Sequence, residues 1–224
     1  LDMQAQTVEV NFGDSTGAIN ITNNFNMGTT DFKISGGSSH DTLSGSIGAD
    51  TFVGGAGADV LSGGLGIDTF KYTSAATSVG AGGANTDVIS DFSSVDDTIS
   101  LMGDGVLGSL LAGVKLTAGS TVADIAVATR DTTSVVDSLA AVYAAIEANA
   151  AFNLAKDFNG SFADAAAAGN KQISAKTIVF TQGAAAGTYL VVNDNVAGFQ
   201  AANDLVIGLG KGAVNFAADD ITTF

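Results

Sequence analysis

A nine-residue repeat from Gly36 to Lys71 constrains the fold of this chain more than any other feature. Its four consecutive blocks read GGSSHDTLS, GSIGADTFV, GGAGADVLS and GGLGIDTFK. Every block has glycine at position one, aspartate at position six and Leu or Phe at position eight. A glycine-rich linker has no reason to keep a large apolar residue in phase. The repeat therefore indicates an ordered, periodic structure.

The period predicts a flattened coil built from turns and very short strands. Glycine supplies the positive φ that tight turns require, and the last three residues of a block form a strand whose middle side chain faces inward. Two blocks complete one coil, so each block stacks on the next but one. Ser39 and Ser46 replace two of the glycines, which weakens the turn Ser38–Asp41 most. The expected stacked pairs are Asp41 with Asp59, Asp50 with Asp68, Leu43 with Leu61, and Phe52 with Phe70.

The GGxGxDxUx nonapeptide resembles the repeat of the RTX (repeats-in-toxin) proteins, where it forms a calcium-binding parallel β-roll. Calcium takes about six to eight oxygen ligands. Two stacked aspartates balance its charge, and carbonyl oxygens of the turns complete the shell. The predicted metal ligands are Gly36, Ser38, Asp41, Gly45, Ile47, Asp50, Gly54, Ala56, Asp59, Gly63, Leu65, Asp68 and Asp87.

The acidic composition agrees with a cation-binding role. The formal net charge is -15, and 21 of the 23 acidic residues are aspartate. Such a chain repels nucleic acid and anionic membranes. The absence of cysteine excludes disulfides and thiolate metal sites. The sequence contains no apolar run of about 18 residues and no visible N-terminal signal peptide, so we expect no membrane insertion.

Residues 1–35 predict short strands ahead of the roll. We expect them to form irregular coils that stack on the first block and cover the open edge of the roll. Apolar residues alternate with polar ones in three places: Val8, Val10 and Phe12; Ile19 and Ile21; Phe32 and Ile34.

Residues 72–101 no longer follow the nine-residue period, but two of their segments still combine aspartate with apolar residues. Asp87–Phe92 reads DVISDF and Asp96–Leu101 reads DDTISL, and both segments predict strands. The pattern resembles the segment that follows the roll in many RTX proteins. Two interpretations of Asp87, Asp91, Asp96 and Asp97 stay open: an additional calcium site at the end of the roll, or acidic turn residues.

Residues 102–170 are rich in alanine and predict a small helical insertion. Val135, Leu139, Val142 and Ile146 recur at helical spacing, which predicts a helix over Ser134–Asn149 whose apolar face packs on a neighbouring sheet. Ser161–Ala168 predicts a second, shorter helix.

Residues 171–224 return to strands. Thr177–Thr181 and Thr188–Asp194 predict a hairpin through Gly183–Gly187, and Asp204–Leu209 predicts a further strand. This arrangement after an alanine-rich stretch resembles the C-terminal region of RTX surface proteins, particularly calcium-dependent bacterial S-layer proteins. The ending AADDITTF resembles the uncleaved C-terminal signal of type I secretion.

The residue types needed for most catalytic sites are missing. His40 is the only histidine and cysteine is absent, which excludes an HExxH zinc site and a cysteine nucleophile. No GxSxG or GxxxxGK[ST] motif occurs, and Arg130 is the only arginine. Carboxylate-only catalysis, as in glycosidases, remains compatible with the composition. Because the repeats already give the aspartates a role, we expect no enzymatic activity.

These observations predict a mainly β protein: a calcium-binding parallel β-roll with flanking strands and a small Ala-rich helical insertion. We expect N-terminal coils over residues 1–35, the roll and its cap over 36–101, and a C-terminal α+β secretion and assembly region over 102–224. The resemblance implies a secreted, calcium-binding structural protein that self-associates at the cell surface as an S-layer or extracellular filament after type I secretion. Two alternatives stay open: the secretion and folding module of a larger RTX exoenzyme or toxin, and a cell-surface adhesin.

Overall fold

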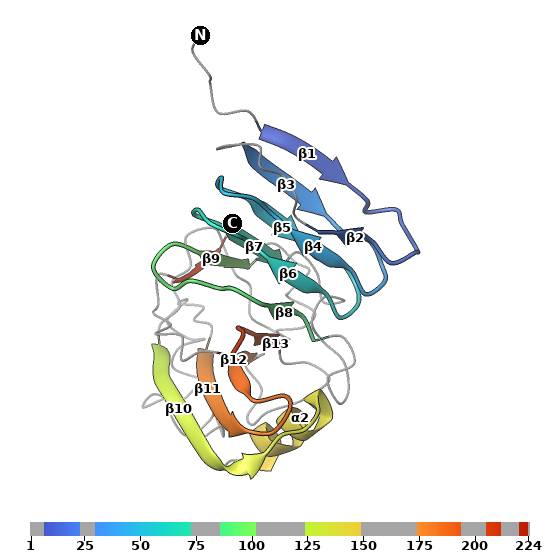
Figure 1. The fold of residues 1–224 in the computed structure, drawn as a ribbon. Helices are drawn as coiled ribbons and strands as arrows, with labels where there is room; N and C mark the ends of the chain where they lie inside the picture. Colours follow the sequence, from blue (N-terminus) through green and yellow to red (C-terminus); the bar gives the residue numbers. More distant parts are fainter. Residues whose placement is uncertain are drawn as a thin grey trace, which may run out of the picture.

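Parallel strands stacked in two sheets dominate the computed structural model (Figure 1). It describes residues 7–22, 30–72, 86–101, 124–148, 174–193, 205–211 and 220–223. Each repeat places one strand of three or four residues in one sheet, and the following repeat places its strand in the other. A flattened coil results, as the nine-residue period predicts.

Sheet one has six strands, and every pair of neighbours in it is parallel. The repeats contribute its centre, and N- and C-terminal segments contribute its two ends. Its strands, in spatial order, are β1 (Thr7–Asn11), β3 (Asp31–Ser35), β5 (Thr51–Val53), β7 (Thr69–Tyr72), β9 (Thr98–Leu101) and β14 (Ile221–Thr223).

Sheet two has eight strands and joins the roll to the C-terminal half of the chain. Gly208 of β13 pairs with Val88 of β8, so the C-terminal strands continue the sheet that the repeats begin. Its strands, in spatial order, are β2 (Asn20–Ile21), β4 (Thr42–Ser44), β6 (Val60–Ser62), β8 (Val88–Ile89), β13 (Leu205–Gly208), β12 (Gly187–Asn193), β11 (Ser174–Gln182) and β10 (Asp124–Val135).

The predicted stacking register of the repeats is confirmed. Leu43 pairs with Leu61 in sheet two, and Phe52 pairs with Phe70 in sheet one. All four side chains are buried. The rings of Phe52 and Phe70 stack with centroids 5.3 Å apart and an interplanar angle of 14°. Position eight therefore builds the core of the roll, as its in-phase apolar residues predict.

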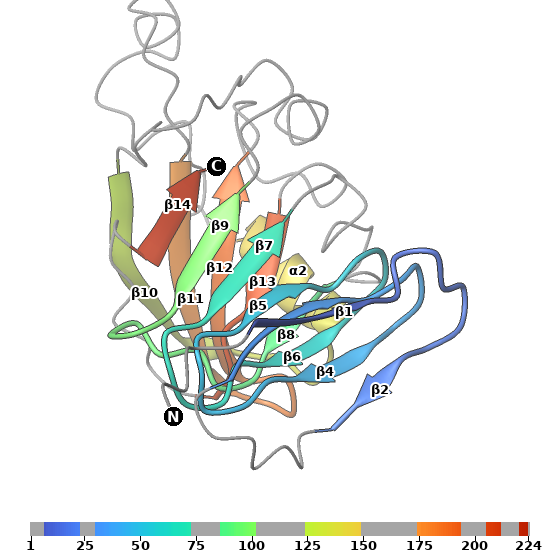
Figure 2. The same ribbon diagram turned by 90° about the horizontal axis from the view of Figure 1, so that it is seen from above.

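The N-terminal coils also form as expected. Strand β1 pairs in parallel with β3, and β2 pairs in parallel with β4, so both extend the roll by stacking on it. Val8, Ile19 and Ile21 are partly buried against the core. Figure 1 shows β1 and β2 in the upper part of the roll, far from β10 and β11, and Figure 2 shows the same strands from above.

The helix differs from its predicted bounds. Helix α2 spans Leu139–Ala148, whereas Ser134 and Val135 belong to strand β10. The helix begins after Ser138, whose Oγ accepts a hydrogen bond from the Ala141 N–H at 3.2 Å, as an N-cap does. Val135 pairs with Gln182 of β11 and is 58% exposed, so it is not part of the helical face. The predicted helix over Ser161–Ala168 lies outside the described residues.

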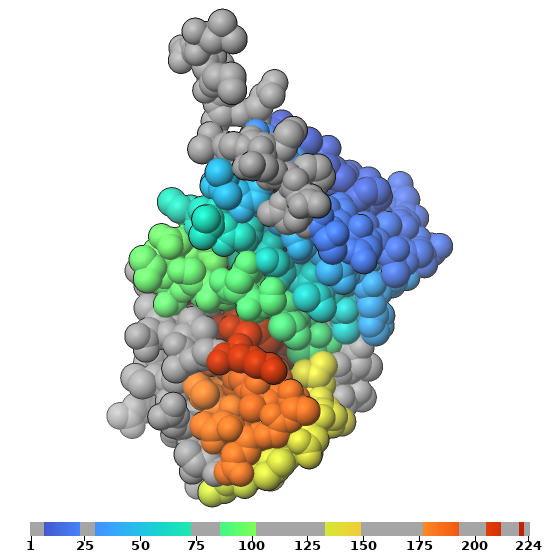
Figure 3. Space-filling view, viewed as in Figure 1, coloured from blue at the N-terminus to red at the C-terminus, as the bar shows by residue number. Residues whose placement is uncertain are grey.

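Two clusters of buried side chains hold these layers together. The first runs from Phe32 through the roll to Ile221 and includes Leu190 and Ile207 of the C-terminal strands. In the second, Val142 and Ile146 of α2 pack on strands β11, β12 and β13, which confirms the expected helix-on-sheet packing. The predicted hairpin also forms, because β11 and β12 are antiparallel on either side of Gly183–Gly187. Figure 3 shows the C-terminal strands directly below the roll.

Candidate metal site

Six buried aspartates form two columns, each column at the turns that enter one sheet. Column one contains Asp41, Asp59 and Asp87, each of which directly precedes a strand of sheet two. Column two contains Asp50, Asp68 and Asp97, each of which directly precedes a strand of sheet one. The repeat places the columns because position six is the last residue before every strand.

A ladder of hydrogen bonds runs along each column. The Oδ1 atom of every aspartate accepts a hydrogen bond from the backbone N–H that lies one coil earlier. In column one the donors are Ile19, Asp41 and Asp59, at 2.7, 2.8 and 2.9 Å from Asp41, Asp59 and Asp87. In column two the donors are Phe32, Asp50 and Asp68, at 2.7, 2.8 and 3.0 Å from Asp50, Asp68 and Asp97.

The second carboxylate oxygen has no protein partner in two of these aspartates. Oδ2 of Asp59 and Oδ2 of Asp68 are buried and accept no hydrogen bond. Each lies over the glycine that opens its own block, Gly54 or Gly63, so closely that a Cβ on that glycine would collide with it. A buried carboxylate oxygen without a partner is costly unless a cation satisfies it.

Burial also changes the protonation of the calcium-free columns. Loss of hydration raises the pKa of Asp59 to about 6 and that of Asp68 to about 7. Neighbouring carboxylates add to these shifts: Asp41 raises the pKa of Asp59, and Asp97 and Asp50 raise that of Asp68. Burial likewise raises the pKa of Asp50 and Asp97. Negative charge on these carboxylates is therefore costly in the calcium-free columns, and a divalent cation that compensates it would be favoured.

The other predicted ligands offer their main chain. The side chains at position three face away from the columns. Leu65 is 71% exposed and Ile47 is 46% exposed. Ser38 is also exposed, and Ala56 is half-buried. At position one, Gly36, Gly45, Gly54 and Gly63 are buried. The carbonyl oxygen of Gly54 lies against Gly36, and that of Gly63 against Gly45, which brings main-chain oxygens next to the carboxylates.

The four aspartates after the repeats do not form one site. Asp87 belongs to column one and Asp97 to column two, because they precede strands of different sheets. Asp91 accepts hydrogen bonds from Ser62 Oγ and from the backbone N–H groups of Gly63 and Gly64, at 2.6, 3.0 and 3.0 Å. Asp96 is exposed. In the described residues, no group of three or more His, Cys, Asp or Glu side chains gathers as a metal site. Asp87 and Asp97 are therefore divided between two columns, which does not favour one calcium site shared by all four aspartates.

Sequence reasoning missed Asp97 as a member of a column. Its signal was present, because Asp97–Ser100 reads DTIS and Asp41–Ser44 reads DTLS. Likewise Asp87–Ser90 reads DVIS, against DVLS at Asp59–Ser62. The changed spacing hid Asp97, which follows its stacked partner by 29 residues instead of 18. Asp87 follows its stacked partner by 28 residues and was among the predicted ligands.

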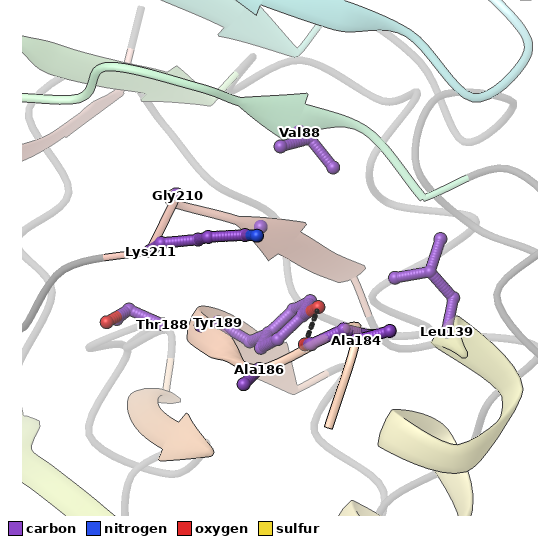
Figure 4. A pocket seen from close by; sticks show the side chains of 11 residues that line it. Val88, Leu139, Ala184, Ala186, Thr188, Tyr189, Gly210 and Lys211 are labelled. Atoms are coloured by element: carbon purple, nitrogen blue, oxygen red, sulfur yellow. Dashed lines mark hydrogen bonds between the residues drawn. The ribbon is translucent and has the colours of Figure 1, made fainter. Parts of the chain in front are cut away.

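A pocket of about 240 Å³ lies between the first turn of α2 and strands β8, β12 and β13 (Figure 4), and Val88, which follows Asp87 of column one, lines it. The hydroxyl of Tyr189 points into it and donates to the Ala185 carbonyl at 2.8 Å. Burial raises the pKa of Tyr189 to about 12, so the phenol stays neutral. Lys211 is the only charged residue in the lining. His40, the histidine of the first repeat, is exposed on its turn and does not line this pocket. This lining brings together no pair of acid and base groups.

Comparison with known proteins identifies the repeats. Residues 35–70 match the RTX calcium-binding nonapeptide repeat in four copies. This segment is therefore a run of calcium-binding repeats of the β-roll type, and its metal is calcium. The orphaned carboxylate oxygens and the oxygen-only ligand set fit that ion.

Similarity beyond the repeats is limited. No curated protein matches the chain. A similar solved structure is the solution structure of the AlgE6R3 subunit from the Azotobacter vinelandii mannuronan C5-epimerase. It is 19% identical, and the match covers 99% of this chain and 81% of that one with a TM-score of 0.44. No helix in the described part of this chain is long and apolar enough to cross a membrane.

Proposed function

We propose that this chain is a secreted calcium-binding structural protein that assembles at the bacterial cell surface, as an S-layer or an extracellular filament. The observation that carries the proposal is the continuity of the sheets. Strands β13 and β14 pair with β8 and β9, so the calcium repeats and the C-terminal half build one scaffold. Folding of the roll on calcium then provides the edges on which the C-terminal strands form.

The proposed ligands are drawn from the aspartates of the two columns and from carbonyl oxygens of positions one and three. Without the ion, stacked aspartates repel one another and orphaned Oδ2 atoms remain buried. Calcium removes both costs, so its binding free energy becomes folding free energy. Extracellular calcium modules often bind at roughly 10⁻⁴–10⁻³ M. A chain with such affinity stays unfolded in the cytosol and folds outside the cell.

The C-terminal tail supports export in the unfolded state. Asp220 and Ile221 are buried, and Ile221 of β14 pairs with Ile99 of β9. A segment that joins the core on folding is accessible to a secretion machinery only before folding. Type I secretion, which reads an uncleaved C-terminal signal, fits this order of events.

The two edges of sheet one support the proposed self-association. Its described strands are all parallel, with β1 at one edge and β14 at the other. The β14 edge of one copy and the β1 edge of the next can therefore continue a parallel sheet, and such a head-to-tail contact generates filaments. A formal net charge of -15 keeps calcium-free copies apart. Bound calcium lowers that repulsion.

Light scattering on the purified chain tests this proposal. We expect particle mass to rise across millimolar calcium, and negative-stain images to show arrays or filaments. Magnesium at equal ionic strength is the matched control, because it screens charge equally but prefers a small octahedral water-rich shell. A chain that stays monomeric at high concentration in calcium refutes surface assembly. That result would favour the second candidate, a folding and secretion module of a larger RTX exoenzyme, toxin or adhesin, for which the same repeats and tail suffice.

A further inference from the structure

The turns of the roll fall into two classes that differ in one hydrogen bond. In three of them, the backbone N–H at position two donates to Oδ2 of the aspartate in the same turn. The donor and acceptor pairs are Gly37 with Asp41 at 2.7 Å, Ser46 with Asp50 at 2.5 Å, and Ser93 with Asp97 at 2.8 Å. We call these the closed turns: Gly36–Asp41, Gly45–Asp50 and Phe92–Asp97.

The remaining two described turns, Gly54–Asp59 and Gly63–Asp68, lack this hydrogen bond. We call them the open turns. Their glycines at positions two and four all have positive φ: Gly55, Gly57, Gly64 and Gly66 at 105°, 123°, 98° and 133°. In the second open turn the N–H of Gly64 donates to Asp91 at 3.0 Å instead of to Asp68. In both, the aspartate Oδ2 is buried and accepts no hydrogen bond.

The class of a turn follows from its sequence. Both open turns have glycine at positions two and four, which permits the positive φ at both places. Each closed turn has a residue with a side chain at one of these places: Ser39 in the first block, Ser46 in the second, and Ser93 with Val95 in the third closed turn. The Ser46 hydroxyl also accepts from the Gly48 N–H at 3.2 Å and donates to the Thr30 carbonyl at 3.1 Å, which fixes its turn further.

A closed turn and a calcium ion make competing demands on the same oxygen. In a closed turn, the N–H group directs its positive end at Oδ2 and satisfies it. The N–H occupies one lone pair of Oδ2 and withdraws charge from it, so a cation binds there less favourably than at an oxygen with no donor. In an open turn the carboxylate oxygen has no donor, and its burial makes a cation the favourable partner.

We propose that the roll binds calcium unequally: the open turns take the ion through Asp59 and Asp68, whereas the aspartates of the closed turns are structural and need no metal. This inference rests on the proposed calcium-dependent folding and assigns which turns carry it. In sheet one, the open turn before Asp68 lies between the closed turns before Asp50 and Asp97. In sheet two, the open turn before Asp59 lies next to the closed turn before Asp41. In sheet one, calcium therefore acts between two turns that need no metal.

Four matched substitutions test the proposal: Asp59→Asn and Asp68→Asn in open turns, and Asp41→Asn and Asp50→Asn in closed turns. Asparagine keeps the Oδ1 acceptor of the ladder in every case. Native mass spectrometry in calcium counts the bound ions. We expect each open-turn variant to lose one ion, and each closed-turn variant to keep the full number. In a closed turn the new NH₂ group meets the turn N–H, so thermal stability in calcium falls although the number of bound ions does not.

The number of calcium ions bound by the unmodified chain tests the proposal even if a variant fails to fold. Unequal binding predicts two ions in the five described turns, one at Asp59 and one at Asp68. The turn before Asp87 lies partly outside the described residues, and one ion there would raise the number to three. Four or more ions, or an equal loss of calcium in Asp50→Asn and Asp68→Asn, would overturn the proposal. A chain that binds no calcium at all would instead refute the proposed function, so the two failures are distinguishable.

Discussion

The backbone N–H of Asp41 donates to Oδ1 of Asp59 at 2.8 Å, across 18 residues of sequence. This one bond shows how the repeat converts sequence into structure. Two blocks of nine residues bring each aspartate directly under the amide of its counterpart, and the carboxylate then holds two coils together. Only its second oxygen remains for a metal.

Removal of the Phe52 side chain should separate core packing from ion binding. Phe52 is fully buried and stacks on Phe70. Phe52→Ala should lower the free energy of unfolding by roughly 3–5 kcal/mol, while the number of bound calcium ions at saturation stays unchanged. Chemical denaturation in calcium measures the first effect and native mass spectrometry the second. Val60→Ala, at a position 43% exposed, is the control and should change stability by less than about 0.5 kcal/mol.

Substitution of Gly55 should disrupt an open turn. Its φ is 105°, and an added Cβ would collide with the carbonyl oxygen of Gly37. Gly55→Ala should therefore cost at least about 1–3 kcal/mol and weaken calcium binding. Gly17→Ala is the matched control, because nothing lies within 4 Å of an added Cβ there. Comparable melting temperatures of the two variants in calcium would show that the positive φ has no energetic role.

Acid should partly replace calcium in the metal-free chain. Burial raises the pKa of Asp59 to about 6 and of Asp68 to about 7, above their unfolded values. A raised folded-state pKa contributes stability that is present at low pH and lost as pH rises through the folded-state pKa. Thermal melts of calcium-stripped protein should therefore show higher stability at pH 5 than at pH 8. The double variant Asp59→Asn, Asp68→Asn should show a smaller difference, and an equal difference would assign the effect to other groups.

Deletion of Asp219–Phe224 should abolish export but not calcium-induced folding. The deletion removes β14 and the buried Ile221, so we expect a stability loss of roughly 1.5–3 kcal/mol. Secretion by a type I system is measured in the culture supernatant, and folding of the purified chain by circular dichroism. Ile221→Ala with the tail intact is the control for stability alone. Export of the truncated chain would show that the signal lies elsewhere.

Periodic features were the ones that the sequence could predict. The in-phase residues at positions six and eight determine which residues stack, so Asp41 over Asp59 and Phe52 over Phe70 follow from counting. Strand β10 was not predicted, because its stability depends on pairing with β11, about 50 residues away in the chain. Asp97 was missed since the regular spacing ends before it. The difference between closed and open turns depends on the direction of one peptide N–H, which the aspartate pattern alone does not reveal.

Hydrogen exchange over residues 36–71, with and without calcium, tests the central claim most directly. We predict that the amides of β4, β5, β6 and β7 lose protection in chelator at neutral pH, because two buried aspartates then carry uncompensated charge. Millimolar calcium should restore protection, and equal magnesium should not. Protection of these four strands that is the same in chelator and in calcium would contradict the claim that calcium folds the roll.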